Sequence, residues 1–295
     1  MANLRDIKNR ITSVESTRQV TRTMEMVSTA KIRKAQENIE HARPYALAMA
    51  EMLGNVTKAA SSVQHPLLAV REEKKKVAII AVTSDRGLAG GFNSNIIHMT
   101  EKYMREQQAA GAEVDLIAVG KKINSYLAYR GIKPALSVQG HTANPTIADA
   151  KAIADRVIRE YTDAAVDEVV IIFNRFVNVA IQRPEISPLL PVSHEDIKKT
   201  EEEDITKISA DYVFEPSAES VLQTLLPTYV EALIFRSLME SAASEHGARR
   251  TAMKAATDAA TEMIGTLSRS YNRARQAAIT TEISEIVGGA AALEG

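Results

Sequence analysis

The stretch that most limits what this chain can fold into is a run near the C-terminus, residues 228–287, that contains no proline. Its only glycines are Gly247 and Gly265, and most of its other residues favour helix. An α-helix rises about 1.5 Å per residue, so roughly 60 helical residues extend on the order of 90 Å. A compact domain cannot enclose a rod of that length. Most of it is therefore expected to project or to be surrounded by something else.

Small and apolar residues repeat along this run and predict a coiled-coil seam. Steps of three and four residues reach Met253, Ala256, Ala260, Met263, Leu267, Ser270, Ala274 and Ala278. A 3.5-residue repeat of this kind is typical of helices that supercoil around a partner. Alanine allows a close approach but buries little area, so the rod is expected to be thin and to depend on its length or on a surrounding partner.

A second long helix is predicted at the N-terminus, where the first 53 residues contain no glycine and a single proline, Pro44. The proline is expected to bend the helix or to weaken it locally. Steps of four and three from Ile7 reach Ile11, Val14, Arg18, Thr21, Glu25, Ser28, Ile32, Ala35, Ile39 and Ala42. The middle of this stripe is polar. The apolar residues there are Val20, Met24 and Val27, each of which lies one residue before a position of the stripe. We interpret this as a seam that rotates, with Met24 either in the core or facing a partner.

Between the two helices, alternating strand and helix patterns predict a doubly wound α/β domain. The expected strands are residues 76–84, 113–119, 136–138 and 167–182 (a long strand or one with a bend), with an edge segment at 184–191 and a last strand at 209–215. The expected helices are 92–110, 121–130 and 146–165. Residues 193–207 form an acidic loop and 65–76 a charged linker. We therefore expect an N-terminal helix at 1–64, an α/β domain at 76–215 and a C-terminal helix at 217–290, with the two helices in an antiparallel coiled coil.

Composition excludes several classes of protein. The net charge of −1 argues against a general nucleic-acid binder, and the absence of cysteine excludes disulfides, zinc–thiolate sites and thiol switches. No apolar run approaches the ~18 residues that span a bilayer, and the N-terminus lacks the apolar stretch of a secretory signal. We expect a soluble protein of a reducing cytosol, which reaches a membrane only through partners.

The best local candidate for chemistry is the glycine-rich turn at residues 84–93, SDRGLAGGFN, between a strand and a helix. Such turns can cradle phosphate with backbone N–H groups at a helix start. This one lacks both the G-x-G-x-x-G order and the end of a P-loop. We favour a structural turn with Asp85 and Arg86 as its hydrogen-bonding frame. Nucleotide binding and contact with a partner remain the alternatives.

An enzyme acting alone is poorly supported. The six histidines show no metal-ligand spacing, and no Ser or Thr lies in a nucleophile-elbow pattern. The terminal helices are instead rich in basic residues, which indicates either solvated faces or contact with an acidic protein or a nucleic acid. These residues are Arg5, Lys8, Arg10, Arg18, Arg22, Lys31, Arg33 and Lys34 on the first helix and Arg249, Arg250, Lys254, Arg269, Arg273 and Arg275 on the last.

Five motifs stand out along the chain: TMEMV at 23–27, SDRGLAGGFN at 84–93, YVFEP at 212–216, NRARQA at 272–277 and ITTEISEIVGGA at 279–290. Together they resemble the gamma subunit family of the bacterial rotary (F-type) ATP synthase, and the resemblance covers essentially the whole chain. It implies two long terminal helices in a coiled coil and a central Rossmann-like α/β domain.

The resemblance also implies a function. In this family the coiled coil is the central stalk within a ring of three alpha and three beta subunits, and its base rests on the c ring with the epsilon subunit. Proton flow turns the c ring and the stalk, and ATP is made or hydrolysed in the beta subunits. The chain itself is expected to be non-catalytic, without cofactor or metal and without nucleic acid. It is expected to be a peripheral protein at the cytoplasmic face of the cell membrane, touching the membrane only through the c ring.

Five residues match contact positions of the family. Arg275 and Gln276 match positions that bind a loop of beta, Met24 matches a position that faces the acidic lever of beta, and Tyr212 and Glu215 match the foot on the c ring. The chain departs from the family at Ala89, where many members have cysteine, and at Gly247 and Arg250, where alanine and a methionine-like residue are commoner. A glycine inside a helix costs roughly 1 kcal/mol relative to alanine, so the shaft is expected to be less stiff there.

Two other hypotheses make different predictions. A nucleic-acid-binding coiled-coil arm would show salt-sensitive binding to RNA or DNA, although few aromatic residues accompany the basic helices. A nucleotide-binding enzyme that uses the turn at Gly87 would bind nucleotide as a lone chain and lose that binding on bulky replacement of Gly90.

Overall fold

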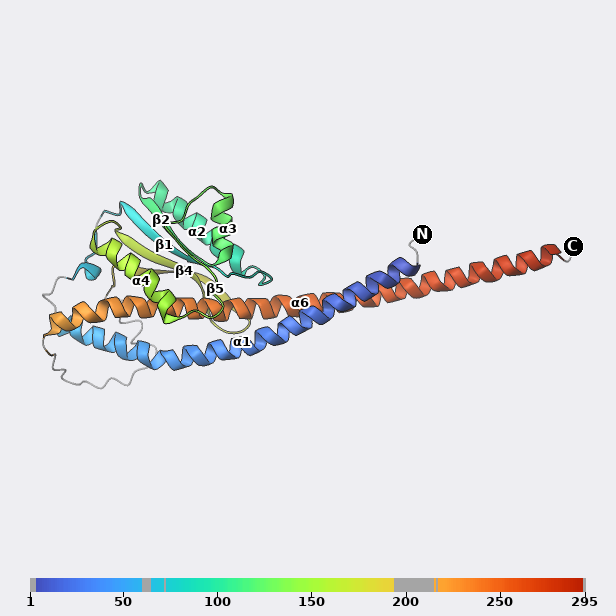
Figure 1. Cartoon of the computed structure of the whole chain (residues 1–295), viewed down its shortest axis with the longest axis horizontal. Coiled ribbons are helices and arrows are strands. Elements are labelled where there is room, and N and C mark those ends of the chain that lie inside the picture. The colour runs from blue at the N-terminus through green and yellow to red at the C-terminus, as the bar shows by residue number, and fades with distance from the viewer. Residues whose placement is uncertain (1–3, 60–64, 72, 194–214, 216, 294–295) are drawn as a thin grey trace. The chain divides into compact units, whose positions relative to one another are not determined.

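A computed structural model describes residues 4–59, 65–71, 73–193, 215 and 217–293 (Figure 1). The chain forms two compact units, one of residues 1–28 with 250–295 and the other of residues 29–249. Two long helices, α1 (Leu4–Ala59) and α6 (Ala218–Leu293), each contribute to both units. The expected division at 1–64, 76–215 and 217–290 follows the helices and strands rather than these units and remains a proposal.

The larger unit contains a five-stranded sheet in the order β3-β2-β1-β4-β5. Its strands are β1 (Lys76–Val82), β2 (Glu113–Val119), β3 (Leu136–Val138), β4 (Glu168–Phe176) and β5 (Gln182–Leu190). The first four are parallel, and β5 pairs antiparallel with β4 at the edge. An edge position suits β5, because it carries Pro184 and Pro188, which cannot donate to a ladder.

The strand expected at 167–182 ends at Phe176, and the edge segment expected at 184–191 pairs with it within β5, so the two form the hairpin β4–β5. The Asn178 side chain accepts hydrogen bonds from the backbone N–H groups of Ala180 and Ile181, both at 2.9 Å, and the N–H of Asn178 donates to the Ile181 carbonyl at 3.1 Å. An asparagine that satisfies the backbone in this way closes a turn. The apolar run alone did not reveal it.

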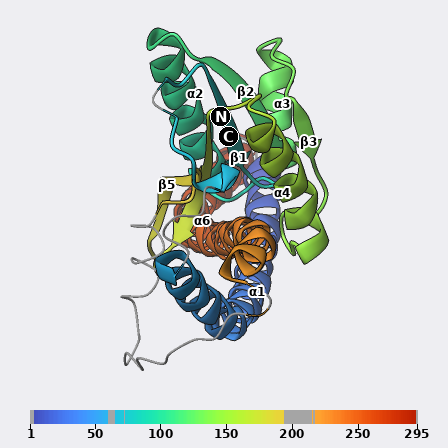
Figure 2. The same cartoon turned by 90° about the vertical axis from the view of Figure 1, so that its left-hand side faces the viewer.

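Helices cover both faces of this sheet, as the doubly wound pattern predicts (Figure 2). Helices α2 (Phe92–Ala109) and α3 (Lys121–Tyr129) pack on one face. Helix α4 (Ile147–Thr162), with parts of α1 and α6, packs on the other, next to the short helix η1 (Pro66–Leu68). Alternate residues of β1 enter the two cores, so the strand is a continuous apolar run.

Helix α6 begins at Ala218, next to the expected start at residue 217, and continues through Pro227. A proline inside a helix costs roughly 3 kcal/mol. The flanking Leu226 and Val230 are fully buried, and burying one such side chain stabilises a fold by about 1.5–3 kcal/mol. Packing against the α/β core therefore offsets the proline. Helix α1 likewise continues through Pro44.

In the smaller unit, α1 and α6 pair as a coiled coil, but the expected rotation of the α1 seam is wrong. The buried face of α1 keeps its register through Thr21 and Ser28, whereas Val20 and Val27 are exposed. The hydroxyl oxygens of Thr21 and Thr257 lie 2.8 Å apart. This hydrogen bond across the seam satisfies both hydroxyl groups. Polar residues can therefore occupy seam positions at which apolar residues were expected.

The α6 seam agrees with the expected one at most positions and differs from it at others. Met253 and Ala260 are buried and Ala256, Leu267 and Ala274 are partly buried, as expected. Met263 is 51% exposed and Ser270 is exposed, and the neighbouring Ile264 and Tyr271 are partly buried instead. Pairing centred on Thr21 and Thr257 places Ile7 opposite Tyr271, close to the start of α1 at Leu4. Beyond Ala274, α6 is exposed on all sides to residue 290, and Ala278 is therefore not in a seam.

Candidate functional site

The glycine-rich turn after β1 is held by a hydrogen-bonded frame, as expected for a structural turn. The Asp85 carboxylate accepts bonds from the N–H of Lys121 at 2.9 Å and from the N–H and hydroxyl of Thr142 at 3.1 and 2.9 Å. Burial by itself would raise the pKa of Asp85, but these bonds and one from the Gly140 backbone outweigh it and lower the pKa. The Asp85 carboxylate thus stabilises the conformation of the turn.

The turn lies at the carboxyl end of β1, where the sheet order reverses between β1 and β4. Doubly wound domains bind ligands at this position. Here α6 approaches the turn instead: the Arg249 guanidinium donates to the Gly87 carbonyl at 3.1 Å and pairs with the Glu245 carboxylate at 2.6 Å. The chain's own helix therefore occupies one side of the place where a nucleotide would be expected.

Arg249 belongs to a part of α6 that is enclosed by protein, residues 237–249, which we call the collar segment. Its buried members include six polar or charged residues beside Arg249, which are Ser237, Glu240, Ser241, Ser244, Glu245 and His246. Arg249 was expected either on a solvated basic face or in contact with an acidic protein or a nucleic acid, but it is only 7% exposed within the chain, so both expectations are wrong for this residue. The reason is that the turn and its neighbours cover this side of the helix.

Burial shifts the acid–base properties of the collar segment. Burial, together with the positive charges of Arg249, Lys31 and Arg86, lowers the pKa of His246 to about 4. Burial also raises the pKa of Glu245, although Arg249 opposes the shift. His246 is consequently neutral at pH 7. Within the described ranges, no three His, Cys, Asp or Glu side chains are grouped so that they could hold a metal ion.

Gly247 has a packing role in the collar segment. A Cβ at this position would lie 2.8 Å from the Gln182 side-chain nitrogen and 3.4 Å from the Val179 carbonyl oxygen. The β4–β5 hairpin thus approaches the helix backbone more closely than another residue would allow. This contact supports the helix where the sequence suggested a weak point.

The opposite situation holds at the end of α6, where Arg275 and Gln276 are exposed. Large apolar side chains follow at helical spacing and are also exposed, namely Ile279, Ile283, Ile286 and Val287. Residues at i, i+4, i+7 and i+8 share one face of a helix. An exposed apolar stripe of this kind marks an interaction surface.

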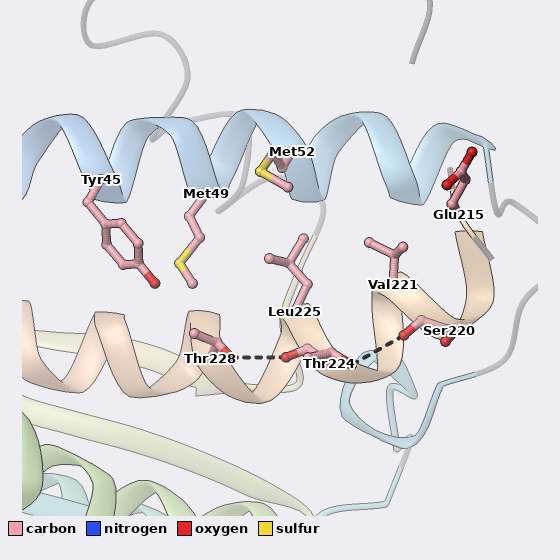
Figure 3. Close-up of a pocket in the computed structure, with 9 residues that line it drawn as sticks. All are labelled: Tyr45, Met49, Met52, Glu215, Ser220, Val221, Thr224, Leu225 and Thr228. Carbon is pink, nitrogen blue, oxygen red and sulfur yellow. Dashed lines mark hydrogen bonds between the residues drawn. The ribbon is translucent and has the colours of Figure 1, made fainter. Parts of the chain in front are cut away.

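Two further expected contact residues lie on other parts of the described chain. Met24 is half-buried on α1, beside the exposed Val20, Met26 and Val27. Glu215 is exposed and lines an open groove of about 490 Å³ between α1 and the start of α6 (Figure 3). Tyr212 lies outside the described residues.

The family model described as ATP synthase matches residues 3–293. An ATP synthase gamma chain from Pelotomaculum thermopropionicum is 49% identical over 294 residues, which cover 100% of each chain. The chain belongs to the ATP synthase gamma chain family. The gamma chain of Stenotrophomonas maltophilia is 42% identical over 293 residues, 99% of this chain and 100% of that one.

Solved structures share the fold of this gamma-family chain. A chain of the Euglena gracilis mitochondrial ATP synthase matches with a TM-score of 0.65 and 19% identity, over 98% of this chain and 94% of that one. A chain of the Tetrahymena thermophila mitochondrial ATP synthase central stalk and c ring matches with a TM-score of 0.59 and 24% identity, over 80% and 99%. In the part of the gamma-family chain that the structure describes, no helix combines the length and apolar character needed to cross a bilayer.

Of the five expected contact residues of this gamma-family chain, Arg275 and Gln276 are neighbours on the exposed end of α6 and Met24 lies on α1, while Glu215 lines the groove of the larger unit. Sequence reasoning missed the collar segment. A signal was present in the spacing of Glu245 and Arg249, because residues four apart face each other on a helix. Nothing in that spacing distinguishes a buried pair from the solvated pairs that are common on helix surfaces.

Proposed function

We propose that the chain is the non-catalytic central-stalk rotor of a proton-translocating F-type ATP synthase. It couples rotation of a c ring to ATP synthesis or hydrolysis in beta subunits. Its partners are three alpha subunits, three beta subunits, an epsilon subunit and the c ring. It resides at the cytoplasmic face of the cell membrane and reaches the membrane only through the c ring.

The main observation in support of this proposal is the exposed C-terminal end of α6. Four large apolar side chains on one helix face, with no cover from the described chain, require an apolar surround in the assembled state. A ring of subunits around the helix would supply it. Membership of the gamma chain family supports such a ring, and the coiled coil provides a rod thin enough to turn inside one.

The individual contacts are proposed on the same basis. Arg275 and Gln276 bind a polar loop of a beta subunit, since both are exposed just before the apolar stripe. Met24 faces the acidic lever of beta beside exposed apolar neighbours. Tyr212 and Glu215 form the foot on the c ring, with Glu215 at the rim of the groove in Figure 3.

Reconstitution tests the proposal. The chain is mixed with alpha and beta subunits of its own organism, and ATP hydrolysis is measured with wild type, with Arg275→Ala and with the control Lys102→Ala on α2. We expect hydrolysis to require the chain, to fall or uncouple with Arg275→Ala and to be unchanged in the control. A chain that neither assembles nor stimulates hydrolysis, or that binds ATP alone and hydrolyses it, would refute the rotor function.

A further inference from the structure

Three parts of the α/β domain that are far apart in the sequence contact the collar segment of α6. The Ser244 hydroxyl donates to the Asn174 carbonyl at 2.9 Å, at the end of β4. Gly247 packs against Gln182 at the start of β5. Arg249 donates to the Gly87 carbonyl in the glycine-rich turn. These contacts involve different sides of the helix, and α1 lies along it as well (Figure 2), so the domain and α1 together enclose the collar segment.

The most specific of these contacts is that of Arg249, whose guanidinium is also held by a buried ion pair within α6. The Glu245 and Arg249 side chains are 2% and 8% exposed, and the guanidinium also contacts His246 Nδ1 at 3.3 Å. Successive residues of a helix are about 100° apart around its axis. A turn of α6 by one residue position would keep this pair together, because both residues lie on α6, but it would remove the guanidinium from the Gly87 carbonyl and leave that acceptor without its partner, which is unfavourable. The contact between Arg249 and Gly87 thus specifies one angular position of α6 within the domain, and Glu245 holds the guanidinium in place for it.

We propose that Arg249, held in place by Glu245, is a positioning residue that prevents α6 from turning within the α/β domain. Torque that enters the domain is then passed to the remainder of α6 without slippage. This proposal rests on the rotor function proposed above and extends it, because it names the contact through which domain and shaft rotate as one. Arg249 touches neither nucleotide nor proton path and acts only through the helix that it fixes.

The test uses the complete complex in membrane vesicles, with ATP hydrolysis and ATP-driven proton uptake measured on the same sample. The variant Glu245→Met with Arg249→Met removes both charges together, so no orphan charge remains and the chain is expected to fold and assemble. We expect at least a twofold fall in protons transported per ATP hydrolysed. Arg249→Lys, which keeps one charged donor, should give an intermediate value.

A matched control is available on α2. Lys102 and Glu106 form a pair with the same i,i+4 spacing as Glu245 and Arg249, and their side chains are 80% and 57% exposed. Lys102→Met with Glu106→Met should leave the number of protons per ATP unchanged. A ratio in the collar variant equal to that of wild type, at normal assembly, would refute the locking role.

A covalent link gives the opposite test. The chain has no cysteine of its own, and a Cβ at Gly87 would make only ordinary contacts with Lys122. In the variant Glu245→Met, Arg249→Cys, Gly87→Cys, a short bis-maleimide should restore the number of protons per ATP that loss of the pair lowers. Failure of the formed link to restore it would contradict the proposal. Failure of the wild-type complex to couple at all would instead overturn the rotor function, and with it this inference.

Discussion

The collar segment and the C-terminal end of α6 belong to the same unbroken helix and have opposite surroundings. Residues 237–249 are enclosed by the α/β domain although they include several charged and polar side chains. Residues 275–290 are exposed although they include three isoleucines and a valine. Helix formation therefore does not depend on which residues are covered within the chain. The contrast separates what stabilises the chain by itself from what it offers to partners.

The first consequence of this comparison concerns the buried ion pair. Arg249→Met alone leaves the Glu245 carboxylate buried without its partner, and we expect a loss of about 3–5 kcal/mol in the free energy of unfolding. Replacing both residues by methionine should cost much less, because neither charge then remains. Urea unfolding of the full-length chain measures both values. Equal losses in the single and the paired variant would show that the pair is not buried as a unit.

The second prediction concerns pH and the neutral His246. Its pKa in the folded chain is about 4, below the value of 6.5 for an unperturbed histidine. Between pH 6.5 and 4 the unfolded chain therefore binds a proton that the folded chain does not, and stability falls as the pH falls. At 1.36 kcal/mol per pKa unit, the loss from this residue approaches about 3 kcal/mol at pH 4 and is absent above pH 6.5.

A comparison with His246→Asn isolates this effect. Other titrating groups, including Glu245 with its raised pKa, act in both proteins and cancel when the two are compared. The stability advantage of wild type over the variant should shrink as the pH is lowered from 6.5 to 4 in urea unfolding experiments. A difference that stays constant over this range would mean that His246 is accessible to protons in the folded chain.

The third prediction concerns Gly247, where the effect of a substitution on the free energy of unfolding should be smaller and should change sign when Gln182 is also replaced. In wild type, Gly247→Ala should destabilise the chain slightly, because the new Cβ displaces the Gln182 side chain, which donates to the Val179 carbonyl at 2.9 Å. In a Gln182→Ala background the same substitution should stabilise it by up to about 1 kcal/mol, since alanine is the better helix former. A double-mutant cycle in urea measures the coupling, and the same sign in both backgrounds would contradict the close approach.

Much of the fold followed from local patterns. The strand at 113–119 and the start of the helix at Phe92 were predicted to the residue, because an apolar run between turn residues specifies its own ends. The phase of the coiled coil was predicted only in part, correctly at Met253 and Ala260 but not at Met263. Steps of three or four both fit an alanine-rich helix, and Thr21 and Thr257 satisfy each other only when both helices are present.

The collar segment was beyond local reasoning for a similar reason. Arg249 and Gly87 are 162 residues apart, so no pattern within α6 reports that a turn after β1 covers it. The motifs of the family led to Arg275, Gln276 and Met24 as partner contacts, which remain predictions because the relevant partners are other chains. The periodicity of the sequence identified which helices and strands form. Which of their side chains are buried depends on the segments that the fold brings next to them.

The smallest effect on the chain itself is expected at its exposed end. Ile283 is 56% exposed, so Ile283→Ser should change the free energy of unfolding of the isolated chain by less than about 0.5 kcal/mol. If the apolar stripe is covered by a ring of subunits, the same variant should weaken assembly with alpha and beta, as measured by co-purification and by stimulated ATP hydrolysis. Glu282→Ser on the adjacent exposed position serves as the control that alters no apolar surface. Normal assembly of Ile283→Ser would mean that the stripe is not the covered face, whereas a large loss of stability in the isolated chain would mean that the end of α6 is already packed within it.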